Sequence, residues 1–363
     1  MKRFHRILTV VCIVSVCIIF LGPICATAEE LRVVTINIWS GLNYVGTLKM
    51  GEYETKEVRE GRYQLLVEEL KALDPDVIAL NEANPLPRYA RRLAKDLDMD
   101  YVSAVGMGGI HIGCVGIPVN FREGDAILAK KELNMRSVGK KRLSGGGIIT
   151  NFFTFHFSEA NQVVGAVIEV AGETVYLFNT HLHAGPPAEQ WFFDLLAEDA
   201  LNGVISPEGL GEILAKIEAD QAWRQEEVDL MLDWMAEIVP EDIPVVLMGD
   251  FNAQIIAPEI QDIVEAGFID TYGATDPDMP GYTWNPEENL SIINLYERET
   301  EGLTPLEFVD VKDNFVSRRI DFIFAGGTFE ASDIVSSDVV LNRSKNNQHP
   351  ADHFGVMSVL NVK

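Results

Sequence analysis

Residues 245–253 read Val245-Val246-Leu247-Met248-Gly249-Asp250-Phe251-Asn252-Ala253, and this stretch decides the fold prediction. A short apolar, β-branched run ends abruptly in Gly-Asp-Phe-Asn, which predicts a buried strand that carries an acid and an amide to the rim of a sheet. Buried strands commonly stop in polar turns, so the plain interpretation is a strand end. A carboxylate and an amide on a rigid strand end also suit a site for a metal ion and a phosphate group.

Other predicted strands share this feature. Polar or titratable residues lie at or just beyond one end of four further strands: Asn37, Glu82, His181, and Asp352 with His353. A single such residue is ordinary for a turn, but five strands with the same feature are hard to attribute to turns. Carboxylate and amide oxygens suit Mg²⁺, with Mn²⁺ or Ca²⁺ as alternatives. Histidines supply the proton transfer of phosphoester hydrolysis, and Asp321 could orient one of them.

Helical periodicity recurs between the strands, over residues 57–73, 89–97, 221–238 and 260–266. This alternation predicts α/β or α+β layers, with two sheets and helices outside them. The glycine-rich stretch 106–116, which contains His111, lacks the strand-to-helix setting of a nucleotide-binding loop, so we predict a flexible surface loop. The acidic stretch 189–220 is interpreted as an insertion or lid.

The first 28 residues have the pattern of an export signal. A basic start is followed by an apolar run without charge over residues 7–21 and by Ala26-Thr27-Ala28, a small-residue cleavage site before Glu29. An uncleaved N-terminal anchor is the alternative. We therefore expect a secreted or cell-envelope protein whose single domain covers residues 29–363. Only Cys114 would remain after cleavage, which excludes an internal disulfide and a cysteine-based metal site.

The chain is strongly acidic, with a formal charge of −26. Removal of residues 1–28 leaves 26 basic and 55 acidic residues and a charge of −29. Such a surface repels polyanions at long range, which argues against a nuclease that holds long duplexes and against plain electrostatic adhesion to anionic membranes. Divalent cations would be attracted.

The motifs resemble those of the endonuclease/exonuclease/phosphatase superfamily, which is related to type I deoxyribonuclease, apurinic endonucleases, bacterial neutral sphingomyelinases and inositol-polyphosphate 5-phosphatases. The resemblance covers almost all of residues 29–363. The matching segments occur in family order: Thr35-Ile36-Asn37, Asn81-Glu82, Thr180-His181-Leu182, Gly249-Asp250-Phe251-Asn252, Arg319-Ile320-Asp321 and Asp352-His353. This resemblance implies a four-layer α/β sandwich, in which two packed mixed β-sheets are flanked by helices and the site lies where the sheets meet.

The resemblance also implies roles for the metal-site residues. Glu82 would be the principal Mg²⁺ ligand, with Asn37 beside it and Asp352 near the metal. Two departures from the family pattern bear on the subgroup. Asn81 stands where glutamine usually precedes the metal-binding glutamate. Trp39 stands where apurinic endonucleases have an acid, which argues against membership of that subgroup.

The remaining roles implied by the resemblance are catalytic. Asp250 and Asn252 would position or activate the attacking water and hold phosphate oxygens. His353, paired with Asp321, would contact the scissile phosphate as an acid or base, and His181 would lie near the phosphate or the leaving group. Whether Asp250 or His353 is the base stays open. The Thr-His-Leu setting of His181 is closer to sphingomyelinases and deoxyribonucleases than to apurinic endonucleases.

These features predict an exported, Mg²⁺-dependent phosphoesterase. A phospholipid head group, such as that of sphingomyelin, or another small phosphodiester is favoured over nucleic acid because of the charge. We expect a monomer that makes transient contact with a membrane surface. The alternatives are a secreted deoxyribonuclease-like endonuclease and a non-catalytic module that binds a phosphorylated ligand. A non-enzymatic cation binder would leave the strand-end pattern unexplained. His183 and His349 match no family role and are expected to be surface histidines.

Overall fold

The computed structural model describes residues 29–113, 115–150, 152–156, 160–295 and 300–363. The predicted export signal in residues 1–28 and Cys114 lie outside the described residues. Within the described ranges, every helix is too short or too polar to cross a membrane.

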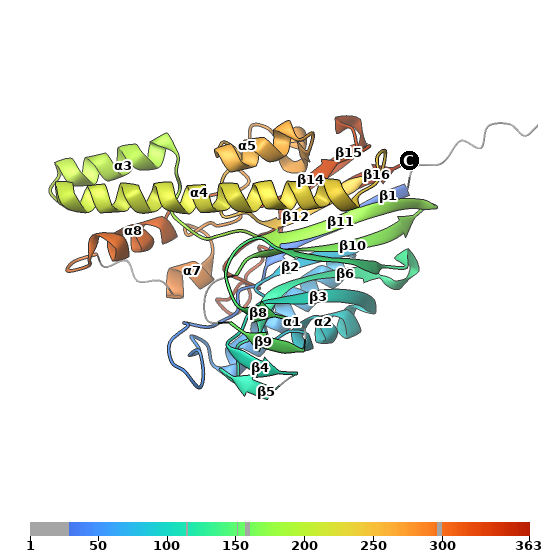
Figure 1. Cartoon of the computed structure of the whole chain (residues 1–363), viewed down its shortest axis with the longest axis horizontal. Helices are drawn as coiled ribbons and strands as arrows, with labels where there is room; N and C mark the ends of the chain where they lie inside the picture. The colour runs from blue at the N-terminus through green and yellow to red at the C-terminus, as the bar shows by residue number, and fades with distance from the viewer. Residues whose placement is uncertain (1–28, 114, 151, 157–159, 296–299) are drawn as a thin grey trace, which may run out of the picture.

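Two six-stranded mixed sheets form the centre of the fold (Figure 1). The first contains, in spatial order, β15 (Ile334–Val340), β16 (Gly355–Val362), β1 (Glu29–Asn37), β2 (Val77–Asn81), β6 (Glu123–Lys130) and β3 (Met99–Met107). The second contains β13 (Ile269–Asp270), β14 (Asp321–Gly326), β12 (Val245–Asp250), β11 (Glu173–His181), β10 (Gln162–Val170) and β7 (Arg136–Arg142). Each sheet has one parallel pair, β1 with β2 and β11 with β12, and its other pairs are antiparallel.

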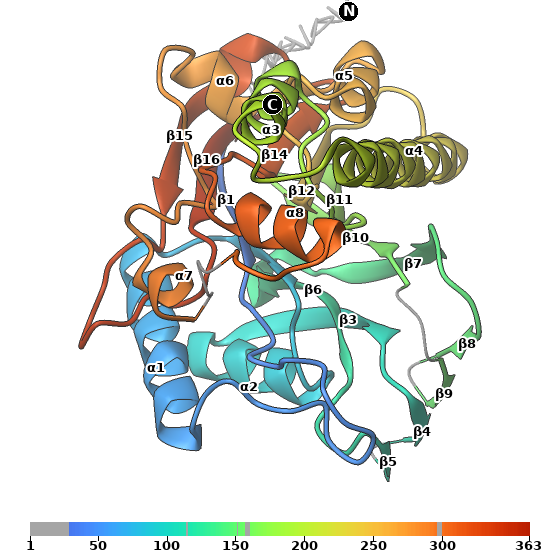
Figure 2. The same cartoon turned by 90° about the vertical axis from the view of Figure 1, so that its left-hand side faces the viewer.

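The central strands β2, β12 and β14 are buried at every residue, so each sheet is covered on both faces. The inner faces share one core, to which Val33, Leu177 and Ile323 belong. Helices α1 (Lys56–Leu73) and α2 (Arg88–Leu97) cover the outer face of the first sheet, and α4 (Pro207–Ile238) and α5 (Pro258–Glu265) cover that of the second (Figures 1 and 2). The predicted four-layer α/β sandwich is thereby confirmed.

The acidic stretch 189–220, interpreted as an insertion or lid, is helical, and its second part is continuous with the helix predicted over residues 221–238. It forms α3 (Gln190–Leu201) and then α4, a single helix of 32 residues that continues without a break to Ile238. Its two early glycines are tolerated because they lie in the first turns, where Pro207 starts the helix and the Ser206 side chain accepts a hydrogen bond from the Gly209 N–H. The first half of α4 packs with α3 and α8 (Pro305–Asn314) around Phe192, Ile213 and Phe308.

The shorter elements complete the description. Two short helices, α6 (Thr271–Thr275) and α7 (Leu290–Leu295), and two 3₁₀ turns (Lys131–Leu133 and Ala331–Asp333) connect the strands. A separate small sheet has the spatial order β5 (Val115–Ile117), β4 (Ile110–Ile112), β9 (Phe153–Phe155) and β8 (Ile148–Ile149).

The flexible loop predicted over residues 106–116 is therefore wrong. The stretch contains the end of β3, strand β4 and the start of β5, and His111 is buried. Gly108 and Gly109 have positive φ and form the turn between β3 and β4. Strands of three residues are too short to give a clear alternation signal, so the glycines dominated the sequence pattern.

Candidate active site

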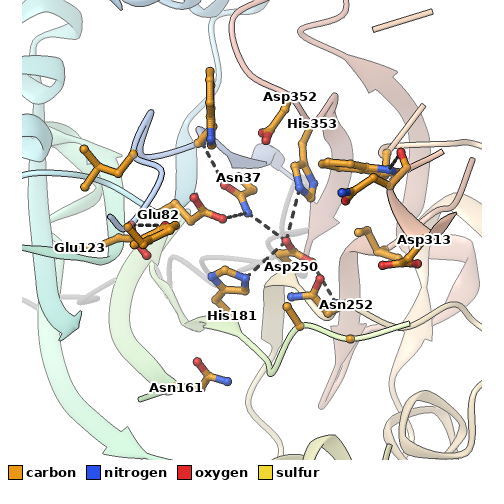
Figure 3. A pocket seen from close by; sticks show the side chains of 18 of the residues that line it. Asn37, Glu82, Glu123, Asn161, His181, Asp250, Asn252, Asp313, Asp352 and His353 are labelled. Atoms are coloured by element: carbon orange, nitrogen blue, oxygen red, sulfur yellow. Dashed lines mark hydrogen bonds and ion pairs between the residues drawn. The ribbon is translucent and has the colours of Figure 1, made fainter. Parts of the chain in front are cut away.

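A cleft of about 520 Å³ lies at one end of the sandwich, where the strand ends of both sheets meet (Figure 3). Asn37 ends β1 and Glu82 follows β2, while His181 and Asp250 end β11 and β12. Because each of these pairs is parallel, its carboxyl ends lie at the same edge of the sheet. Seven of the eight predicted site residues line the cleft: Asn37, Glu82, His181, Asp250, Asn252, Asp352 and His353.

Asp250 lies at the centre of this group and is buried. Its Oδ2 accepts a hydrogen bond from Nδ2 of Asn37 at 3.0 Å, and Nε2 of His181 and of His353 lie 3.6 Å and 3.8 Å from the same oxygen. Its Oδ1 accepts from the backbone N–H of Asn252 at 2.9 Å. The carboxylate is therefore fixed in place by groups from several separate segments of the chain (Figure 3).

Asp321, the eighth predicted residue, lies behind His353. It is the first residue of β14 and pairs directly with Asp250 across the antiparallel ladder. Its Oδ2 is 2.8 Å from Nδ1 of His353, whose ring also meets Trp284 edge-on with centroids 5.1 Å apart. Burial lowers the pKa of His353, but Asp321 and Asp250 outweigh it and raise that pKa to about 10.

His181 is the second histidine of the cleft. Burial again lowers its pKa, while the carboxylates of Asp250 and Glu82 raise it, and the net result is a pKa of about 9. Both imidazoles are therefore protonated at neutral pH in the metal-free protein.

The predicted metal residues form the acidic side of the cleft. Glu82 has a left-handed backbone (φ 54°), its Oε1 accepts from Nδ2 of Asn37 at 2.9 Å, and its Oε2 accepts from the N–H of Ser40 at 3.1 Å. Burial raises the pKa of Asp352 to about 7, with His353 opposing and Glu82 adding to the shift. Hard oxygen donors gathered in a buried acidic site are what a divalent cation requires.

A further acidic residue, Glu123, lines the cleft and was not predicted from the sequence. Glu123 begins β6 and lines the cleft, and its Oε2 accepts a hydrogen bond from the Tyr44 hydroxyl at 2.9 Å. Burial and the charge of Glu82 raise the pKa of Glu123 to about 8. The strand-end pattern missed it because Glu123 stands at a strand start, and only the antiparallel pairing of β6 with β2 brings it beside Glu82.

A different acidic group has the tightest geometry. Within the described ranges, one set of three side chains places potential metal-ligand atoms within 4.8 Å of one another: Asp250, Asp321 and His353. A histidine ligand must be deprotonated, however, and the raised pKa of His353 opposes this. The geometry of this group is that of an acid–histidine pair, so the oxygen donors Asn37, Glu82 and Asp352 fit a cation better.

Asn81 supports the site from behind. Its Nδ2 lies within hydrogen-bond distance of Oδ1 of Asp125 (2.9 Å), Oδ1 of Asn179 (3.1 Å) and the carbonyl of Thr180 (2.9 Å). Its Oδ1 accepts from the backbone N–H of Asp250 at 3.2 Å. This buried amide thus joins the first sheet to both parallel strands of the second and fixes the strand end that carries Asp250.

The two histidines predicted at the surface are buried instead. Nε2 of the His183 ring lies 3.0 Å from Oδ1 of Asp220, and this ring stacks on that of Trp223 with centroids 4.0 Å apart. The backbone N–H of His183 donates to Oε2 of Glu227 at 2.7 Å. These contacts attach the segment that follows His181 to α4. His349 packs against Phe354. For His183 the prediction failed because the residues that cover it belong to α4, which is distant in the sequence.

Comparisons with known proteins agree with this architecture. A profile described as the Endonuclease/Exonuclease/phosphatase family matches residues 34–353. The chain belongs to this family. Members of the endonuclease/exonuclease/phosphatase family hydrolyse phosphoester bonds and generally use divalent metal ions. Among curated proteins, none matches the sequence.

Solved structures of the family share the fold. A structure of D. rerio TDP2 complexed with single strand DNA product is 15% identical, with 92% of this chain and 100% of that chain covered and a TM-score of 0.56. A Bacteroides thetaiotaomicron mannosyl-6-phosphatase is 17% identical, with 92% and 100% covered and a TM-score of 0.55. A family protein from the same organism is 16% identical, with 93% and 99% covered and a TM-score of 0.56. The TM-scores and the coverage of these structures show a common fold.

Proposed function

We propose that this protein is an exported, Mg²⁺-dependent phosphodiesterase that releases the phosphorylated head group of a phospholipid such as sphingomyelin. Export would depend on residues 1–28, and the enzyme would act as a monomer. The charge of the cleft carries the choice of substrate. Among the described residues that line the cleft, Arg318 is the one lysine or arginine, and it is 2.8 Å from Asp313. A track of basic side chains, which a nucleic-acid backbone requires, is therefore missing from these lining residues.

The walls of the cleft support the same substrate class. Trp39, Tyr44, Tyr53 and Trp284 line it together with several carboxylates. Aromatic faces beside acidic groups favour a cationic head group, because the ring quadrupole and the carboxylates both attract positive charge.

Asn37, Glu82 and Asp352 are the residues that would hold the Mg²⁺ ion, and Mn²⁺ or Ca²⁺ would suit the same oxygen donors. When bound, the ion supplies positive charge that stabilises the developing charge on the phosphoryl group.

The catalytic side chains have complementary roles. Asp250 accepts a proton from the attacking water, whose oxygen forms the new bond to phosphorus while the bond to the leaving oxygen breaks. Protonated His181 donates the proton that the leaving oxygen needs. His353, held by Asp321 and with a raised pKa, is assigned to stabilising the phosphoryl oxygens by its charge. Asn252 would help to hold a phosphoryl oxygen.

A substrate panel tests the proposal. The protein comprising residues 29–363 would be assayed with sphingomyelin, phosphatidylcholine, a sugar phosphate, RNA, and single- and double-stranded DNA, with Mg²⁺ and with a chelator. We expect Mg²⁺-dependent release of phosphocholine and no cleavage of DNA. Cleavage of DNA without release of phosphocholine would support the secreted endonuclease. Hydrolysis of none of these substrates would support the phospho-ligand-binding module.

A further inference from the structure

The small sheet has two faces of opposite character. In its register, Ile112 lies opposite Val115 and Phe153, and Phe155 lies opposite Ile110 and Ile148. Residues directly opposite one another share a face of a sheet. One face of the small sheet is therefore built entirely from aliphatic and aromatic side chains, to which Ile117, opposite Ile110, also belongs.

This apolar face is turned to solvent. Val115, Ile112 and Phe155 are 74%, 60% and 49% exposed, whereas His111 and Thr154 on the opposite face are buried. A sheet with one solvated face normally places polar side chains outward and apolar ones inward. The small sheet reverses this order, and a contiguous exposed apolar surface of this kind marks an interaction site.

The apolar surface extends to the mouth of the cleft. The loop of residues 43–53 lies beside the small sheet in both views (Figures 1 and 2), and the Val119 N–H donates to the Leu48 carbonyl at 2.9 Å. This loop exposes Val45 and Leu48, 69% and 67% accessible, while its Tyr44 lines the cleft. A body that covers the small sheet and this loop would therefore also lie over the entrance to the cleft.

The charge distribution points to the same kind of partner. The segments from Tyr101 to Phe121 and from Leu143 to Ser158 contain no Asp, Glu, Lys or Arg, in a chain of net charge −26. The adjoining strand β7 has the sequence Arg-Ser-Val-Gly-Lys-Lys-Arg, and Nη1 of its exposed Arg142 donates to the Gly147 carbonyl at 2.6 Å, next to β8. Uncharged apolar surface bordered by basic residues is complementary to lipid acyl chains bordered by head-group phosphates.

We propose that the exposed face of the small sheet, together with loop 43–53, docks on a phospholipid surface and positions the cleft over a head group. The choice of a lipid surface rests on the proposed function, because it takes the covering body to be the substrate carrier. The docking surface itself contains none of the residues assigned to catalysis or metal binding, so docking and hydrolysis can be measured separately.

Vesicle sedimentation in chelator tests docking without hydrolysis. The protein comprising residues 29–363 would be mixed with phosphatidylcholine vesicles, with and without added phosphatidylserine, and compared with an Ile112→Ser/Val115→Ser variant. We expect the parent protein to sediment with both kinds of vesicle. The variant should bind at least about tenfold more weakly, because each substitution removes a large apolar side chain from the interface. The matched control is Leu201→Ser/Ile256→Ser, which changes exposed apolar residues on α3 and before α5 and should bind like the parent.

The outcomes separate docking from catalysis. Hydrolysis of a soluble chromogenic phosphodiester with Mg²⁺ should be equal in the parent, the docking variant and the control. No binding of the parent to either vesicle, or an equal loss in the control variant, would overturn the docking proposal even if the soluble diester is hydrolysed. Concentration-dependent self-association that the docking variant abolishes, without vesicle binding, would also overturn it and assign the face to a second copy. Vesicle binding without any hydrolysis would instead count against the proposed function alone.

Discussion

Nδ1 of His353 lies 2.8 Å from Oδ2 of Asp321, and Asp321 is the strand partner of Asp250, whose own Oδ2 lies 3.8 Å from Nε2 of the same ring. Two carboxylates from paired strands therefore enclose one buried imidazole. This arrangement fixes the orientation of the ring and keeps it positively charged near the centre of the cleft.

Asp321→Asn should lower the pKa of His353 from its value of about 10, because Asp321 supplies the largest favourable charge. In the parent, folding raises the pKa of His353. The stabilisation that this provides is fully present below pH 6.5, the ordinary pKa of histidine, and is lost as the pH rises through about 10. The free energy of unfolding of the variant should therefore be lower than that of the parent near neutral pH, and the difference should be smaller above pH 10. Imidazole NMR titration of the chelated protein and urea unfolding at both pH values measure the two effects. An unchanged His353 titration would contradict the assigned pair.

Glu82→Gln should have opposite effects with and without metal. In chelator the variant should be more stable than the parent, because Glu82 adds to the raised pKa values of Asp352 and Glu123 and its removal relieves that repulsion. Saturating Mg²⁺ should raise the melting temperature of the parent by about 5 °C but not that of the variant. Asp313→Asn, on the other side of the cleft, is the control. An equal Mg²⁺ response in Glu82→Gln would remove Glu82 from the metal site.

Asn81→Leu should destabilise the fold by roughly 3 kcal/mol or more, because it leaves several buried partners of the amide without a hydrogen bond. Urea unfolding measures this loss. The same change at the exposed Asn342 should be nearly neutral. Equal effects at the two positions would show that Asn81 does not join the sheets.

The predicted strand ends were accurate because they depend on local patterns. Asn37 and Asp250 end their strands as expected, His181 ends a strand that runs two residues further than predicted, and parallel pairing brings the three to one edge. The strand-end pattern does not predict Glu123, because this residue starts an antiparallel strand. Glu123 lies in the cleft only because β6 pairs with β2 in the sheet.

The errors have a common cause in tertiary context. The alternation of Ile110-His111-Ile112 is too short to predict a strand against the loop signal of the flanking glycines. The strand also has its polar His111 buried and its isoleucines toward solvent, which is the reverse of the usual pattern. The continuity of α4 depends on a cap at Ser206 and on packing against α3 and α8, which helical periodicity in one segment does not contain.

The most direct test of the central claim is the rate of Mg²⁺-dependent hydrolysis of the phosphodiester substrate by Asp250→Asn, beside the parent and Asp313→Asn. Asp250 is the group to which Asn37, His181 and His353 all converge, and the amide cannot accept the proton of water. We predict that kcat of Asp250→Asn falls by about 10³-fold while the fold and Asp313→Asn activity are retained. Parent-like activity of Asp250→Asn would contradict the account.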